Sequence, residues 1–297
     1  MNGTAWAWPW WSIMATIGVI NMVLGIVIFN KSKKAEVTTE GNYQKRMRIL
    51  GIIFISVALY RSFFISQYLT QLAWFDTIFN SSVIIRFFAC FAEVSFILLI
   101  MYSYQQISRE IPDPYEGTTG KAVKFMEKYF PFYAFLCIFT AQFFANTALV
   151  TKFKALFAIE ETLWGVAFLF ILPVSLIHLK RVYSYKDNES KKELKLYRIF
   201  TPVLAIFTVG YTAYSLCYHL PFEYWPYAVD QFKDGAVNPV IRLGWAAVKD
   251  AFFNVNVTRD YNTWGGIGFM IWYTGYFSLC VWMVLVMMFA PRKLSSK

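Results

Sequence analysis

Seven apolar segments divide the chain, and each is about as long as a helix that crosses a membrane. A bilayer core requires about 20 helical residues, and the segments run approximately over residues 10–29, 49–69, 81–103, 129–148, 155–179, 199–220 and 265–290. Hydrophobic residues make up 58% of the 297 residues and charged residues 15%, whereas soluble domains hold about 45–50% apolar and about 25% charged residues. The sequence therefore predicts an all-α integral membrane protein, a single domain over residues 1–297 with seven transmembrane helices.

The basic residues lie mostly in the loops on one side of these spans. Twenty of the 28 Lys and Arg residues fall between residues 31–48, 104–128 and 180–198 or in the C-terminal tail, and six fall on the opposite side. Loops rich in Lys and Arg stay in the cytoplasm. We therefore expect the N-terminus outside and the C-terminus in the cytoplasm or an equivalent compartment. The loops carry no pattern of stacking aromatics, so the expected contact is the lipid bilayer and not nucleic acid.

Two charges interrupt the third span, residues 81–103. Arg86 and Glu93 are seven residues apart, which is two helical turns, so both project from one face of the helix. A lone charge at the bilayer centre costs at least roughly 2.5–3.5 kcal/mol. Both side chains must therefore point into the bundle and find partners there.

Other polar side chains are predicted at a similar depth in the membrane. From the helical rise, Arg86 lies roughly 8 Å and Glu93 roughly 18 Å below the outer surface, and Arg61 lies at about 12 Å. Glu160 and Glu161 of the fifth span lie at about 8–12 Å. Tyr214 and His219 approach the same region from the sixth span. The sequence therefore predicts one polar cluster in the outer half of the bundle.

This predicted cluster admits three interpretations. It could pair internally and only fix the helices, or bind a small ligand or ion, or perform catalysis. Our leading hypothesis is a carrier-like or receptor-like protein that binds a small anionic ligand or an ion. In it Arg61 and Arg86 hold a carboxylate or phosphate, Glu93, Glu160 and Glu161 balance charge or carry a proton, and Tyr214 and His219 line the mouth.

Two alternatives remain open. The chain could be a structural subunit that assembles with other membrane subunits, or an intramembrane lipid-modifying enzyme with Glu160 or Glu161 as general base beside His219. No catalytic residue, cofactor or metal site can be assigned. The four cysteines all lie within apolar spans and the two histidines are predicted at opposite membrane faces, so neither a disulfide framework nor a zinc site is indicated.

The longest outer connection, residues 221–263, contains a helical pattern. From Pro239 onward, apolar residues recur at steps of three and four: Ile241, Trp245, Val248, Phe252 and Val255. Charged residues lie between them. This spacing predicts an amphipathic helix over about residues 239–256 that lies in the membrane interface or covers the mouth of the bundle.

Five stretches carry a family pattern that coincides with the polar cluster. They are residues 60–63, 76–82, 86–93, 159–164 and 273–282. In them the chain resembles a family of uncharacterised bacterial and algal polytopic membrane proteins without known activity. The chain has Ile65-Ser66 where the family pattern has Pro-Arg. The resemblance implies the fold and the location of the site, and no reaction.

Overall fold

The computed structural model describes residues 4–30, 39–67, 70–112, 115, 117–185, 191–233, 237 and 239–289. Helices make up most of this part of the chain. They are α1 (Ala7–Asn30), α2 (Thr39–Phe63), α3 (Ser82–Glu110), α4 (Gly117–Thr151), α5 (Lys154–Ser184), α6 (Lys191–Tyr214), α7 (Trp225–Asp230), α8 (Gly244–Phe253), α9 (Gly266–Gly275) and α10 (Val281–Met288). Two π-helical stretches, Ser215–Tyr224 and Tyr276–Cys280, join α6 to α7 and α9 to α10.

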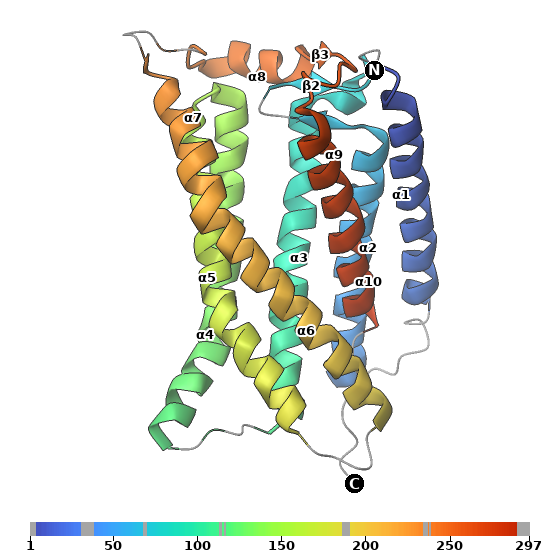
Figure 1. Ribbon diagram of the computed structural model, residues 1–297, viewed down its shortest axis with the longest axis vertical. Coiled ribbons are helices and arrows are strands. Elements are labelled where there is room, and N and C mark those ends of the chain that lie inside the picture. Colours follow the sequence, from blue (N-terminus) through green and yellow to red (C-terminus); the bar gives the residue numbers. More distant parts are fainter. Residues whose placement is uncertain are drawn as a thin grey trace.

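The long helices form one bundle, across which α6 and α7 run obliquely as a continuous element (Figure 1). Within the described residues, six helices are long and apolar enough to cross a membrane: Ala7–Asn30, Ser82–Glu110, Gly117–Thr151, Lys154–Ser184, Leu194–Asp230 and Gly266–Met288. Large apolar side chains face outward along them, as Ile20, Leu24 and Val27 do on α1. Such surfaces require lipid, and the predicted all-α membrane bundle is confirmed.

The predicted second span corresponds to α2, which packs against α1, α3 and α10 inside the bundle. Helix α2 is not among the six helices that are apolar enough to cross a membrane, because it contains Lys45, Arg46, Arg48 and Arg61. The predicted end at residue 69 was wrong. The helix ends at Phe63, since the backbone of Ser66–Gln67 pairs with a strand instead of continuing the helical hydrogen bonds.

A small sheet closes the end of the bundle at which α1 begins, called the upper end here (Figure 1). Strand β1 (Ser66–Gln67) pairs antiparallel with β2 (Leu72–Ala73), and β2 pairs parallel with β3 (Asn256–Val257). The sheet ties the α2–α3 connection to the segment before α9. Trp74, directly after β2, and Trp264, just before α9, are fully buried, and their ring centroids lie 5.6 Å apart. Strands of two residues carry no periodic signal, so the sequence did not predict them.

Helix α8 lies across the upper ends of α3 and α4 (Figure 1). It is shorter than the predicted 239–256, and Ala247 and Ala251 are the fully buried side chains of the helix. Trp245, which belongs to the predicted apolar face, is 70% exposed. Small side chains allow the close approach of α8 to the bundle, and a large apolar side chain in their place would hold it off.

Charged contacts fasten α8 to the α4–α5 turn. Lys152 Nζ lies 2.7 Å from Asp250 Oδ2, and Arg242 forms a second ion pair with the same carboxylate. Burial by itself would raise the pKa of the Asp250 carboxyl. Hydrogen bonds from Lys152, Asn254 and Arg242, together with the Lys152 charge, outweigh burial and lower this pKa to about 2.

The basic loops predicted to face the cytoplasm are only partly described. Lys31, Lys33, Lys34 and Lys186, and the tail residues Arg292, Lys293 and Lys297, lie outside the described residues. Helix α1 begins at the upper end and α10 ends toward the opposite, lower end (Figure 1). The two ends of the described chain therefore lie on opposite sides of the bundle.

Candidate functional site

Arg86, in the upper half of α3, is surrounded by polar side chains from three helices. Its Nη1 donates to Glu93 Oε1 at 2.6 Å and its Nη2 to Glu93 Oε2 at 3.2 Å. Nη2 also donates to Glu160 Oε1 of α5 at 2.8 Å and to Gln142 Oε1 of α4 at 3.1 Å. Gln142 Nε2 in turn donates to Glu93 Oε2 at 2.9 Å. These four residues form the Arg86 cluster.

The Arg86 cluster is buried throughout. Arg86 is 0% exposed, Glu160 2%, and Glu93 and Gln142 6% each. Arg86 and Glu93 share one face of α3 and point into the bundle, as their spacing predicted, and Glu160 contacts Arg86 from α5. One guanidinium serves two carboxylates, so the cluster has a formal charge of −1 when both are ionised.

Glu161 belongs to a second group of polar side chains, although it follows Glu160 directly. Consecutive helical residues point about 100° apart, and Glu161 Oε2 lies 3.6 Å from His219 Nε2. His219 Nδ1 lies 2.5 Å from Glu223 Oε2 and 2.9 Å from the Tyr214 hydroxyl. These four residues form the His219 cluster. The Glu223 side chain is 43% exposed, so this cluster reaches the surface of the protein.

The His219 cluster rests on the π-helical stretch Ser215–Tyr224. The wider turn of a π-helix changes the direction of side chains relative to an α-helix, and such stretches are frequent at functional sites. It brings His219 and Glu223 beside Glu161. The sequence predicted Tyr214 and His219 at this place but not Glu223, because Glu223 lies beyond the predicted end of the span at residue 220.

Arg61 lies on the other flank of α3. Its guanidinium carbon is 5.1 Å from the centre of the Phe277 ring, and the hydroxyl of Tyr273 donates to the Arg61 carbonyl at 2.7 Å. With Ala92 and Tyr276, the Arg61 side chain lines a cavity of about 10 Å³, which holds no more than a water molecule. Arg61 thus contacts residues of the C-terminal helical segment, while Arg86 contacts residues of α4 and α5.

A further buried cluster at the lower end was not predicted. Glu127 of α4 accepts a hydrogen bond from Arg181 Nη2 at 2.9 Å, and its Oε1 lies 3.1 Å from His178 Nε2. The Ser108 hydroxyl lies 3.0 Å from the same His178 nitrogen. The prediction missed Glu127 because it began the fourth span at residue 129, whereas α4 starts at Gly117.

None of the three clusters groups metal-ligating side chains in the way a metal centre does. Within the described part of the chain, no three His, Cys, Asp or Glu side chains are grouped so as to hold a metal ion. No protein-family model, curated protein or solved structure matches the chain.

Proposed function

We propose that this protein is an ion-binding integral membrane protein, that its ion is a proton, and that the Arg86 cluster holds it. The observation that carries the proposal is the contact of one guanidinium with two buried carboxylates, Glu93 at 2.6 Å and Glu160 at 2.8 Å. A single carboxylate would neutralise Arg86. The second leaves a negative charge in a region where burial of net charge costs several kcal/mol. One proton on Glu93 or Glu160 makes the cluster neutral.

The same contacts disfavour an anion at Arg86. Both terminal nitrogens of the guanidinium already donate to Glu93, Glu160 or Gln142, and the side chain is 0% exposed. A bound carboxylate or phosphate would have to displace one of the carboxylates that belong to the chain. It would also bring further negative charge into the cluster. A proton requires neither change.

The His219 cluster supports exchange of this proton with the upper side. Glu223 is partly exposed, His219 lies between Glu223 and Glu161, and Glu161 is the neighbour of Glu160 on α5. Histidine changes its charge near neutral pH and is suited to pass protons. We therefore assign His219 and Glu161 to proton delivery and Glu160 to proton binding.

Infrared spectroscopy of the purified protein in lipid nanodiscs tests this function. We expect a band from a buried protonated carboxylic acid at neutral pH. Glu160→Gln and Glu93→Gln should each remove it, because the remaining carboxylate then pairs with Arg86 and stays ionised. Glu110→Gln, at the lower end of α3, is the matched control and should leave it unchanged.

Exchange is measured in the same samples after a jump of external pH. His219→Phe should slow the response of the band without removing the band itself. Absence of the band in the wild-type protein would overturn the proposal. A band that does not respond to external pH would leave the cluster with the structural role of fixing the helices.

We further propose that α2 is the seventh span, with the upper end outside the cell or in an equivalent compartment. With 25 residues, α2 is long enough to cross. Of its buried charges, Arg61 lies in the last turn and Arg48 lies nine residues after the first residue of the helix. Terminal tags tested for accessibility in intact cells should then report opposite sides. Membership of the uncharacterised family resembled by the five sequence stretches is likewise a proposal.

A further inference from the structure

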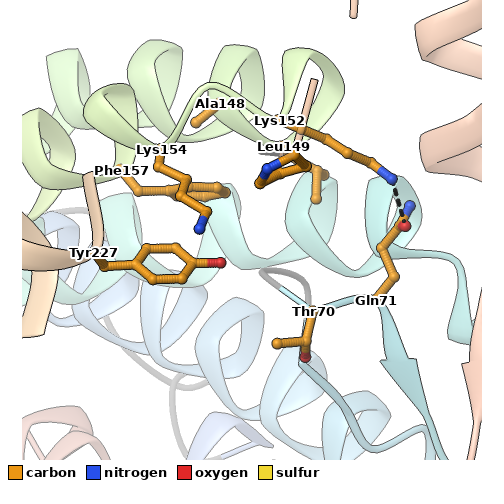
Figure 2. Close-up of a pocket in the computed structure, with 9 residues that line it drawn as sticks. Thr70, Gln71, Ala148, Leu149, Lys152, Lys154, Phe157 and Tyr227 are labelled. Carbon is orange, nitrogen blue, oxygen red and sulfur yellow. Dashed lines mark hydrogen bonds between the residues drawn. The ribbon is translucent and has the colours of Figure 1, made fainter. Parts of the chain in front are cut away.

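A cavity of about 180 Å³ opens at the upper end between the α4–α5 turn, α7 and the α2–α3 connection (Figure 2). Its floor is apolar and consists of Ala148, Leu149 and Phe157, each at most 4% exposed. A cavity of about 150 Å³ is large enough to hold a benzene molecule. The cavity therefore has room for a small organic molecule, and its floor suits the apolar part of one.

Positive charge exceeds negative charge at the rim of this cavity. Lys152 lines it, and its Nζ donates to Gln71 Oε1 at 2.9 Å, as Figure 2 shows. The partner carboxylate of Lys152, Asp250, is shared with Arg242. Two cations thus face one carboxylate, and one unit of positive charge remains.

Lys154 adds a second positive charge. Its amine points into the cavity beside the ring of Tyr227 in Figure 2, with Nζ 3.7 Å from the ring centre. An ammonium group over an aromatic face is stabilised without being neutralised. Asp230 acts on the Lys154 charge, but its carboxylate forms an ion pair with Lys233. The rim is therefore suited to a negatively charged group.

The backbone at this rim is held in an unusual conformation. Among the described residues, the non-glycine residues with positive φ are Gln71 at 53° and Lys152 at 58°. Both line the cavity, and their side chains bind each other. Such left-handed conformations cost free energy and cluster at ligand-binding sites. Together they fix the rim side chains over an otherwise apolar floor.

The geometry points to a binding site for a small organic monoanion, a carboxylate or phosphate joined to an apolar body about the size of a benzene ring. Lys154 binds the anionic group, Tyr227 lies beside it, and the floor receives the apolar body. This site lies above the Arg86 cluster and shares no residue with it. Binding at this site can therefore be tested separately from the proton proposed for Glu93 and Glu160.

Titration with benzoate of the full chain in phosphatidylcholine nanodiscs, followed by calorimetry, tests the site. Wild-type protein should bind benzoate, and Lys154→Met should weaken binding about ten- to a hundredfold, the usual range for losing a charged hydrogen bond. Lys154→Arg, which keeps the charge, should retain most of the affinity. Lys249→Met, which removes an exposed charge of α8 outside the cavity, should not change it.

Two further measurements are made. The first separates the contribution of the ligand's charge to affinity from that of its apolar body, and the second distinguishes a free small anion from a lipid headgroup as the natural ligand. Benzyl alcohol, which has the ring but no charge, should bind at least about tenfold more weakly than benzoate. Phosphatidylglycerol added to the nanodiscs competes with benzoate if the natural anion is a lipid headgroup, and does not compete if it is a free small molecule. Either result supports the site.

Two outcomes would overturn the proposal. One is no measurable benzoate binding to the wild-type protein, and the other is equal affinity in wild-type and Lys154→Met proteins. A Lys154→Met sample that fails to fold is recognised by its circular dichroism, and the salt dependence of wild-type binding then decides. Benzoate affinity unaffected by added salt contradicts an ionic contact.

Discussion

Removal of Arg86 should destabilise the bundle more than any surface substitution. In Arg86→Met, Glu93 and Glu160 lose a partner at 2.6 Å and 2.8 Å while they remain 6% and 2% exposed. Breaking a buried ion pair from one side costs about 3–5 kcal/mol, because the remaining charge is neither solvated nor paired. Because one of the two carboxyl groups carries the proposed proton, one uncompensated charge remains in Arg86→Met, and the loss should fall within this range.

Unfolding by sodium dodecyl sulfate in mixed micelles, followed by tryptophan fluorescence, measures this loss. Arg109→Met is the matched control on the same helix, since Arg109 is exposed, and should change stability by no more than about 1 kcal/mol. Adding Glu93→Gln and Glu160→Gln to Arg86→Met should recover most of the loss, since no charge is then buried. An Arg86→Met protein as stable as Arg109→Met would refute the reasoning.

Four further substitutions are measured in the same way. The folded-state pKa of Asp250, about 2, is below the ordinary aspartate value of 3.8, so the contribution of its ion pairs to folding stability should be present at neutral pH and be lost as the pH falls from about 4 to 2. Asp250→Asn should remove up to about 2 kcal/mol at neutral pH and abolish this dependence. Gly25→Leu should cost about 1–3 kcal/mol, because a Cβ there would lie 3.0 Å from Ile55 Cδ1. Gly268→Leu should cost less, since no described atom lies within 4 Å of its Cβ position. Glu127→Gln should cost about 3 kcal/mol, because it leaves the buried Arg181 charge without its carboxylate.

The intolerance of hydrocarbon for unpaired charge made the centre of the site predictable. Arg86 and Glu93 had to share a face at a spacing of seven residues, and Glu160 had to find a cation at similar depth. The same reasoning could not place Arg61. Depth gives height in the membrane but not the direction around the helix axis, and Arg61 packs beside Phe277.

Sequence reasoning also missed a neutral polar residue and two glutamates that lie beyond the ends of the predicted spans. Gln142 completes the Arg86 cluster, but an amide in a span costs less than a charge and gives a weaker signal. Glu223 and Glu127 fell outside the predicted spans because apolar runs end before the helices do. Capping residues, or a charge allowed in the last turns, could have extended the predicted fourth and sixth spans far enough to include Glu127 and Glu223.

The adjacency of Glu160 and Glu161 links the two clusters mechanically. Both are fixed on one helix, so a rotation or shift of α5 that displaces Glu161 from His219 must also move Glu160 relative to Arg86. Phe157, in the floor of the upper cavity, lies about one helical turn above them on α5. The cavity lining and the Arg86–Glu160 contact therefore share one helix, α5. The π-helical stretch that carries His219 also packs against α5. A small movement of this stretch would therefore shift α5 and the buried Glu160 that it carries.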